Sequence, residues 1–286
     1  MPTLRQLRDR VKSLKNTQQI TRAMKMVAGA RIRRAELAMR ASRPYASAIG
    51  EMLGEVAAGG ATDPLLERRP VATPAILLMT ADKGLCGAFN ANLARAALTA
   101  AQEGGQQTRL YLVGAKGRLL LRRSPYAVAE YWGLSAMPFA ELARAIAQRV
   151  RDDFLGGIVD RVVLISSRFV STIVQRPDTT TLLPVTAQGE RAGTPRDPAK
   201  NAFEFEPDPG SVLAALLPKY LEFTIFQALL ETQASEFAAR LIAMTNATDN
   251  AGKLIDELTL VMNNTRQAAI TKEILEIVGG AEALSG

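Results

Sequence analysis

The chain has 286 residues, 48% of them hydrophobic, which excludes global disorder and leaves room for one large domain or two smaller ones. It contains no histidine and one cysteine, Cys86, so an intramolecular disulfide, a Ser-His or Cys-His nucleophilic pair and an imidazole metal ligand are all excluded. The net charge of +7 is concentrated in residues 1–45, where twelve Lys or Arg against two acidic residues leave a local excess of +10.

Residues 3–57 are predicted to form one long amphipathic helix. Apolar side chains recur along its first half at steps of three and four, with an interruption at Gln18: Leu4, Leu7, Val11, Leu14, Ile20, Met24 and Val27. We expect a kink at Pro44 and an end near Gly59 and Gly60. Because this helix carries the basic excess, its partner is expected to be acidic: nucleic acid, an anionic surface or carboxylates of another protein.

Residues 71–207 are predicted to form an α/β domain. Three short apolar runs are typical of buried strands: 75–80, 109–114 and 161–166, the last with room to continue toward residue 174. Three helical patterns alternate with them: 90–103, 116–123 and 141–154. This alternation favours a Rossmann-like domain with a mostly parallel sheet. The proline-rich segment 188–210 is expected to be a surface loop or hairpin, with a short edge strand at 203–205.

The C-terminal part, residues 208–286, is predicted to contain a second long helix over 211–278. Small and apolar residues recur there at alternating steps of three and four, a set that we call the C-terminal seam: Leu241, Met244, Thr248, Ala251, Ile255, Leu258, Met262, Thr265 and Ala269. No proline follows Pro218, so nothing obliges this helix to stop before Gly279. Its length would be roughly 100 Å, and because a lone helix draws little stability from itself, it needs a partner helix.

The N-terminal helix, residues 1–60, is the obvious partner, because the chain leaves the α/β domain on one helix and enters it on the other. We therefore predict an antiparallel coiled coil of the two terminal helices with the α/β domain inserted between them. The longer C-terminal helix would extend past its partner, so another protein must cover its apolar residues.

The loop after the first predicted strand, Asp82–Asn90, lies where phosphate-binding loops occur in α/β folds. Its spacing matches neither the dinucleotide fingerprint nor the phosphate-binding loop of nucleotide hydrolases. We interpret it as a structural turn in which Gly84 and Gly87 permit a tight path and Asp82 or Asn90 caps it. Without a histidine base, Cys86 is interpreted as a buried structural thiol, and no cofactor or metal is expected.

Two polar sets remain open to interpretation. Met24 and Lys25, with the cations Arg31, Arg33 and Arg34, form either core packing with a solvated face or a surface for a carboxylate-bearing partner. Near the other end, Arg266 and Gln267 follow Asn263, Asn264 and Thr265, and these groups need partners only if protein surrounds the helix.

No apolar run approaches the roughly 18 residues that span a bilayer, and the helical pattern from residue 3 leaves no room for a signal peptide. Together with the single cysteine, this predicts a cytoplasmic protein that does not cross a membrane by itself.

Three segments, residues 16–28, 82–90 and 247–281, resemble the gamma subunit of F-type rotary ATP synthases in its bacterial form. The resemblance implies a noncatalytic rotor shaft inside a ring of alpha and beta subunits, with the α/β domain on the epsilon subunit and the c-subunit ring. It implies a peripheral position at the cytoplasmic face of the cell membrane, which the chain reaches only through the c ring.

The resemblance also assigns roles to the two polar sets. Met24, Lys25 and the cations Arg31, Arg33 and Arg34 match a stretch that faces acidic lever loops of beta. Arg266 and Gln267 match a polar contact near the end of the shaft. The function implied is coupling of transmembrane proton flow to ATP synthesis or hydrolysis by the alpha/beta ring.

Two other classes remain as alternatives. A nucleic-acid-binding protein would explain the basic helix but not the C-terminal seam, along which acidic residues are expected to be exposed: Glu231, Glu236, Asp249, Asp256 and Glu257. An α/β enzyme using the loop around Cys86 would be active alone and blocked by thiol alkylation.

Overall fold

The computed structural model describes residues 3–58, 62–186, 206 and 208–285. The chain divides into two compact units, one formed by Gly29–Arg240 and the other by Met1–Ala28 together with Leu241–Gly286. We call the first the α/β unit and the second the helix-pair unit, and each is described by itself. Two long helices contribute to both units: α1 (Leu4–Ala58) and α5 (Pro209–Ser285).

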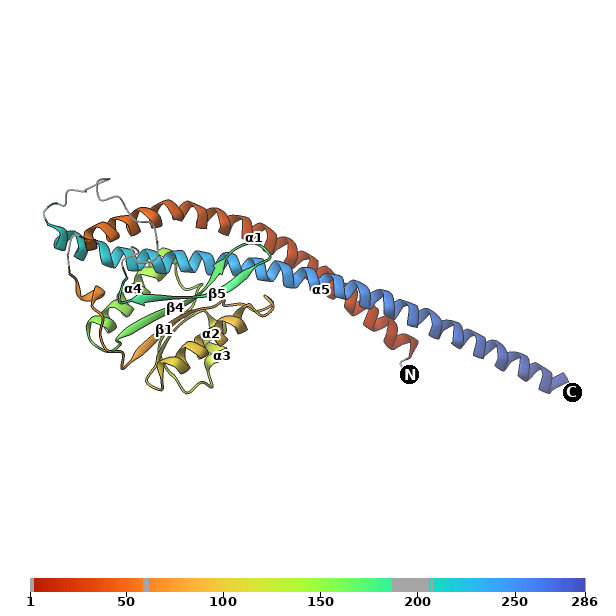
Figure 1. Ribbon diagram of the computed structural model, residues 1–286. Coiled ribbons are helices and arrows are strands. Elements are labelled where there is room, and N and C mark those ends of the chain that lie inside the picture. Colours follow the sequence, from red (N-terminus) through yellow and green to blue (C-terminus); the bar gives the residue numbers. More distant parts are fainter. Residues whose placement is uncertain (1–2, 59–61, 187–205, 207, 286) are drawn as a thin grey trace. The chain divides into compact units, whose positions relative to one another are not determined.

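The α/β unit contains one five-stranded sheet in the order β3-β2-β1-β4-β5 (Figure 1). Its strands are β1 (Pro74–Met79), β2 (Arg109–Val113), β3 (Ala127–Trp132), β4 (Arg161–Phe169) and β5 (Gln175–Leu183). Strands β1 to β4 are parallel, and β5 pairs antiparallel with β4. The predicted mostly parallel sheet is confirmed, and its three predicted strands are the three central ones.

The two edge strands were not predicted. The third predicted strand continues past residue 166, as expected, but does not reach residue 174. Strand β4 ends at Phe169, and a tight turn in which Val170 N–H bonds Val174 O starts the return strand β5. Strands β3 and β5 lie at the two edges of the sheet, where many of their side chains remain partly or fully exposed. They therefore lack the continuous apolar run that marks a strand buried on both faces. The predicted edge strand at 203–205 lies outside the described residues.

Helices cover both faces of this sheet (Figure 1). Helices α2 (Phe89–Gly104) and α3 (Ala115–Leu121) pack on one face, against alternate residues of β1, β2 and β4. Helix α4 (Phe139–Leu155) packs on the other face with parts of α1 and α5. Because successive strand residues point to opposite faces, Ile76 and Leu78 enter the first layer while Leu77 and Met79 enter the second.

Helix α1 has the predicted length, whereas α5 continues to Ser285, past the predicted end at residue 278. Helix α1 continues through Pro44 and α5 through Pro218, so neither proline ends a helix. One 18-residue window of α5 is apolar enough by mean hydropathy, 1.3, to qualify as a membrane span, a criterion that core helices of soluble proteins also meet. Within the α/β unit, α5 contributes Leu213, Leu217 and Leu221 to the core beneath it.

The helix-pair unit is held by residues at alternating steps of four and three on α1: Leu7, Val11, Leu14, Gln18, Thr21, Lys25 and Ala28. The predicted stripe is wrong after Gln18, because Ile20 and Val27 are 61% and 53% exposed. Thr21 and Ala28 are buried in their place. The packed face continues through polar residues because they find hydrogen-bonding partners on α5.

Those partners centre on one residue of α5. The Thr248 hydroxyl donates to Thr21 Oγ1 at 2.8 Å, and Gln18 Nε2 donates to Thr248 O at 3.4 Å. The C-terminal seam is confirmed from Met244 to Ile255, whose seam residues are buried. Farther along, Ala269 is exposed, as expected for the part of the helix that was predicted to need cover from another protein.

Candidate partner-contact surfaces

The predicted cations Arg31, Arg33 and Arg34 lie on α1 within the α/β unit, and all three are exposed. The Arg31 guanidinium stands 5.7 Å from the ring centroid of Phe237 on α5, a cation–π contact that leaves its charge facing outward. Guanidinium groups at exposed positions are suited to pairing with carboxylates of a partner.

In the helix-pair unit, Met24 and Lys25 are half-buried beside the Thr21–Thr248 contact. Arg266 and Gln267 are exposed and lie 18 residues farther along α5 than Thr248, a distance of about 27 Å along a helix. Within this unit, Met24 and Lys25 therefore lie apart from Arg266 and Gln267. The other members of the first predicted set, Arg31, Arg33 and Arg34, belong to the α/β unit.

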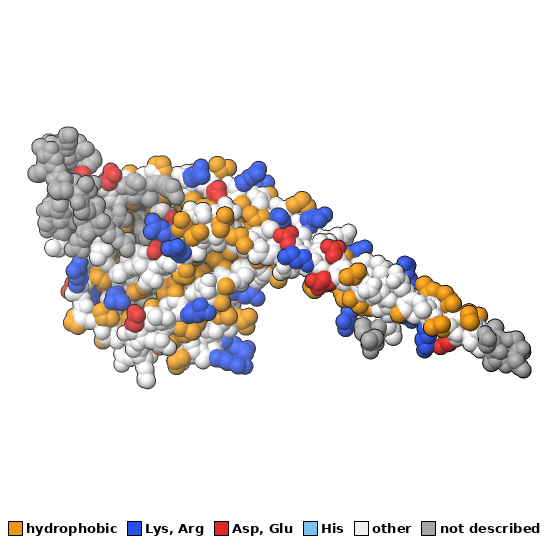
Figure 2. Space-filling model, turned by 45° about the vertical axis from the view of Figure 1, so that its right-hand side comes forward, with side chains coloured by type: hydrophobic (Ala, Val, Ile, Leu, Met, Phe, Trp, Pro, Cys, Tyr) orange, Lys and Arg blue, Asp and Glu red, His pale blue; other side chains and the backbone are white. Residues whose placement is uncertain are grey.

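The end of α5 that carries Arg266 is exposed at every residue from 266 to 279. Large apolar side chains are prominent there: Ile270, Ile274, Leu275, Ile277 and Val278. Figure 2 shows hydrophobic side chains gathered toward this end of the helix. An exposed apolar surface of this kind marks an interaction site, and this one has room for contact on all sides.

The loop Asp82–Asn90 is held by its own side chains. The Asn90 amide oxygen accepts the Ala81 N–H at 2.9 Å. The Asp82 carboxylate accepts the N–H of Ala115 at the start of α3, also at 2.9 Å. Gly87 has a φ of 60°, whereas the other positive φ of the loop belongs to Leu85, at 62°, and not to Gly84.

Cys86 belongs to this loop, and its side chain is turned into the core and is 2% exposed. The Asn90 Nδ2 group donates to Cys86 Sγ at 3.2 Å. Burial raises the pKa of the Cys86 thiol, and the nearby Glu236 carboxylate raises it further. The thiolate is thus disfavoured, which does not fit a nucleophile.

Replacing Asn90 with Ala should lower the free energy of unfolding by about 1–3 kcal/mol, because the buried Ala81 N–H would lose its acceptor. Urea unfolding measures the loss. Asn92→Ala is the control, since Asn92 is an exposed residue on the same turn of α2. Equal losses in the two variants would contradict the structural role of the Asn90 side chain.

The carboxyl ends of β1 and β4 form the switch point of the sheet, where doubly wound folds bind ligands. Strands β1 and β4 pair only as far as Leu78 and Ile165, after which Thr80 N–H bonds Val113 of β2. Beyond that point Ser167 of β4 bonds α5 instead.

Two side-chain hydroxyl groups of α5 form hydrogen bonds with the backbone of Ser167, which β1 no longer pairs with at this point. The Ser167 N–H donates to Thr232 Oγ1 at 3.2 Å, and Ser235 Oγ donates to Ser167 O at 3.4 Å. Thr232, Ser235 and Ser167 are all buried. Helix α5 therefore fills the crevice in which a nucleotide would bind in a fold of this kind.

An ion pair that was not predicted stands at the end of this contact. Arg240 Nη2 donates to Glu236 Oε1 at 2.6 Å and to Gly84 O at 3.1 Å. Glu236 was expected to be exposed and is instead buried, which raises the pKa of its carboxyl, while the charge of Arg240 opposes that shift. The acid-base spacing of four residues was visible in the sequence, but its burial was not.

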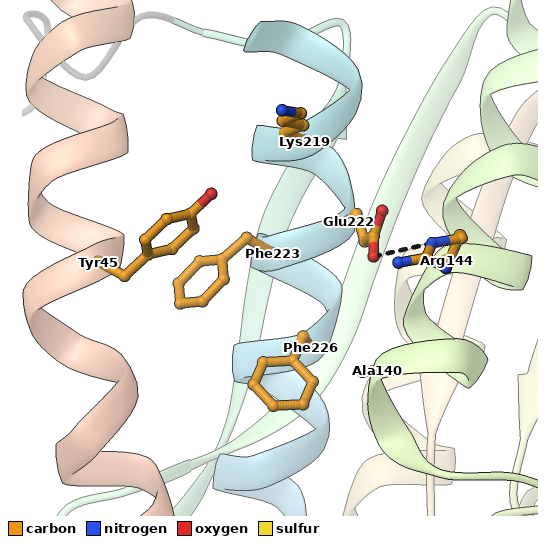
Figure 3. A pocket seen from close by; sticks show the side chains of 7 residues that line it. All are labelled: Tyr45, Ala140, Arg144, Lys219, Glu222, Phe223 and Phe226. Atoms are coloured by element: carbon orange, nitrogen blue, oxygen red, sulfur yellow. Dashed lines mark ion pairs between the residues drawn. The ribbon is translucent and has the colours of Figure 1, made fainter.

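A cavity of about 380 Å³ lies between α1, α4 and α5 in the α/β unit. Figure 3 shows its lining residues: Tyr45, Ala140, Arg144, Lys219, Glu222, Phe223 and Phe226. The Tyr45 and Phe223 rings meet edge to face with centroids 4.6 Å apart, and Arg144 pairs with Glu222 at 3.3 Å. These contacts join the three helices, and the lining offers aromatic packing and an ion pair rather than a nucleophile with its base.

Among the residues that the structure describes, no group of three or more Cys, Asp or Glu side chains is arranged to hold a metal ion.

Comparison with known proteins assigns the chain to a family. A family model described as ATP synthase matches residues 3–284. The ATP synthase gamma chain of Desulforamulus reducens is 48% identical and covers 99% of this chain and 100% of its own length. The ATP synthase gamma chain of Pelotomaculum thermopropionicum is 46% identical with the same coverage.

Solved structures agree in fold. A chain from the central stalk and c-ring structure of Tetrahymena thermophila mitochondrial ATP synthase has a TM-score of 0.61 and 27% identity, and the match covers 80% of this chain and 99% of that one. A chain from Euglena gracilis mitochondrial ATP synthase has a TM-score of 0.66 at 20% identity and covers 98% and 94%. With a family model over nearly its whole length and relatives close to half identical, the chain belongs to the ATP synthase gamma chain family.

Proposed function

We propose that this chain is the noncatalytic rotor shaft of a bacterial ATP synthase, coupling proton flow across the membrane to ATP synthesis or hydrolysis. The end of α5 carries this proposal: it is exposed from residue 266 to 279 and bears large apolar side chains. A helix of this kind gains stability only when another protein surrounds it. A ring of alpha and beta subunits is such a sheath.

The proposed partners follow from the two units. The helix-pair unit would stand inside the alpha/beta ring, with the basic face of α1 toward acidic loops of beta. The α/β unit would contact the epsilon subunit and the c-subunit ring, in keeping with the central stalk and c ring of the Tetrahymena structure. The chain would then be a peripheral protein at the cytoplasmic face of the cell membrane.

A noncatalytic role is supported by the α/β unit. The crevice at the carboxyl ends of β1 and β4 is filled by Thr232 and Ser235 of α5. The thiol of Cys86 is buried, with a raised pKa. Family membership also leaves the nucleic-acid-binding alternative without support.

The mechanism follows from symmetry. One asymmetric shaft among three equivalent catalytic subunits touches each of them differently, so each subunit adopts a different nucleotide affinity. Turning the shaft reassigns these states in sequence. Ion flow turns it in one direction, and ATP hydrolysis turns it in the other.

Lys25→Ala and Arg266→Ala should weaken coupling without abolishing ATP hydrolysis in the reconstituted complex. A charged interface contact is worth about 1 kcal/mol of binding free energy, so its loss should lower ATP-driven proton pumping per ATP hydrolysed while hydrolysis continues. Arg176→Ala, at an exposed position of β5 outside the helix-pair unit, is the control. Unchanged coupling in both variants would reject these residues as contacts.

The isolated chain should neither hydrolyse ATP nor bind it, because α5 fills the crevice of the sheet. Isothermal titration calorimetry with ATP and magnesium measures this. A stoichiometric binding isotherm would overturn the noncatalytic assignment.

A further inference from the structure

Helix α5 contacts the rest of the α/β unit in two chemically different stretches. Its first stretch is apolar and packs in the core through Leu213, Leu217, Leu221 and Ile225. Its second stretch adds polar contacts at the carboxyl edge of the sheet, through Thr232, Ser235, Glu236 and Arg240, beside the buried Ala234 and Ala238. The change occurs along one continuous helix.

These two kinds of contact resist different motions. Apolar burial is non-directional, so it opposes separation of the helix from the sheet without selecting particular atoms as partners. Hydrogen bonds weaken steeply when their angles change. The polar stretch therefore fixes the rotational setting of α5 against the sheet.

Arg240 makes the last of these contacts before α5 enters the helix-pair unit at Leu241. One nitrogen, Nη2, serves both Glu236 and the carbonyl of Gly84, and the Arg240 and Glu236 side chains are only 9% and 10% exposed. An ion pair this buried contributes little net stability, and removing one partner leaves the other charge buried without a counter-charge. Its specific use here is to orient the guanidinium toward the loop.

The loop that Arg240 holds is strained. Leu85 follows the accepting carbonyl directly and has a φ of 62°, a conformation that is costly for a residue with a bulky side chain. Its side chain is 64% exposed, so packing does not hold it in place. A strained conformation persists only when its surroundings impose it, and Arg240 adds to the restraint from Asn90 and the buried Cys86 by bonding Gly84 O.

We propose that Arg240, oriented by Glu236, is a positioning residue that clamps the loop Asp82–Asn90 to α5, so that torque passes between this helix and the sheet without slippage. The torque-transmission part rests on the proposed rotor function. The clamp itself does not, and the two parts are tested separately.

Cys86 is a built-in probe for the clamp. It is the only cysteine of the chain, and it belongs to the clamped loop, with its side chain buried in the core layer that contains Leu78 and Phe89. In the full-length chain, its reaction with a disulfide reagent such as dithionitrobenzoate should be slow. Arg240→Met should raise the rate at least about tenfold, as expected for loss of a charged hydrogen bond that closes the loop.

Electrostatics cannot account for such an increase. The charge of Arg240 lowers the pKa of the Cys86 thiol, so its removal alone would raise that pKa and slow the reaction. Faster reaction must then come from exposure of the sulfur. Arg176→Met, at an exposed arginine of β5, is the matched control and should react like the wild type.

Two further measurements separate clamping from general damage. Thermal unfolding followed by circular dichroism shows whether Arg240→Met retains its fold. The isosteric Glu236→Gln removes a charge that raises the pKa of the Cys86 thiol, so the variants are compared by the rate constant of the thiolate, taken from the pH dependence of the reaction. That rate constant should rise in Glu236→Gln as well, and the double variant should exceed Arg240→Met by less than twofold, because the two residues act as one unit. An unchanged Cys86 rate in Arg240→Met, or additive effects in the double variant, would overturn the clamp.

The torque-transmission part of the proposal is tested in the reconstituted ATP synthase. Arg240→Met should leave ATP hydrolysis within about twofold of wild type and lower proton pumping per ATP roughly fivefold, whereas Arg176→Met should change neither. A faster Cys86 reaction with unchanged pumping would overturn the torque role and leave a structural clamp. Absence of pumping with the wild-type chain would instead overturn the rotor function, while the Cys86 rates still decide the clamp.

Discussion

Gly114→Ala should lower the free energy of unfolding of the α/β unit by more than about 4 kcal/mol. Gly114 joins β2 to α3 with a φ of +90°, and a Cβ atom there would lie 2.1 Å from Thr80 O and 2.7 Å from Thr80 C. Thr80 is fully buried, and its N–H bonds Val113 O at 2.8 Å, so the backbone cannot move aside. Urea unfolding followed by the fluorescence of Trp132, the only tryptophan, measures the loss.

A matched control separates the steric clash from the cost of the backbone conformation. Gly105 has a similar φ of +86°, but a Cβ atom there would meet nothing within 4 Å. Gly105→Ala should therefore cost only about 1–3 kcal/mol, the strain of a backbone conformation (φ 86°, ψ −179°) that is essentially restricted to glycine. Similar losses in the two variants would contradict the close approach of Gly114 to Thr80.

Phe154→Ala is expected to cost about 3–5 kcal/mol, the second of the two largest effects. Phe154 is 0% exposed at the end of α4, in the core shared with β1, β2, β4 and α5. The Arg69 guanidinium stands 5.0 Å from its ring centroid and would lose that contact. The same Trp132 unfolding experiment applies, because Trp132 packs against this core.

The neighbouring residue serves as the control for Phe154. Leu155 is 45% exposed and follows on the same helix, so Leu155→Ala removes a similar apolar side chain from a site with little burial. Its cost should stay below about 1 kcal/mol. Comparable losses at the two positions would mean that the cavity left by Phe154 collapses without penalty.

The sequence predicted the central strands β1, β2 and β4 because strands buried on both faces need unbroken apolar runs. It did not predict β3 and β5, whose exposed or polar residues carry no such run. Their pairing depends on the neighbouring strand offering free backbone groups, a property of the assembled sheet.

A similar division applies to the candidate site. The cations of α1 and the pair Arg266 and Gln267 were visible as residue types at exposed positions of helices. The buried contact of Glu236 and Arg240 with Gly84 joins positions more than 150 residues apart, which helical spacing alone does not reveal. Glu236 was for that reason expected to face solvent.

The sequence by itself determined the two long helices, the α/β domain between them and the need for a sheath, because these follow from local periodicity and from apolar surface that one chain cannot cover. Only the tertiary structure decided which polar residues are buried. The face of α1 passes through Gln18 and Thr21 rather than Ile20, because their polar groups meet Thr248. A polar residue enters a packed face when a partner satisfies its hydrogen bonds, and that partner lies far away in the sequence.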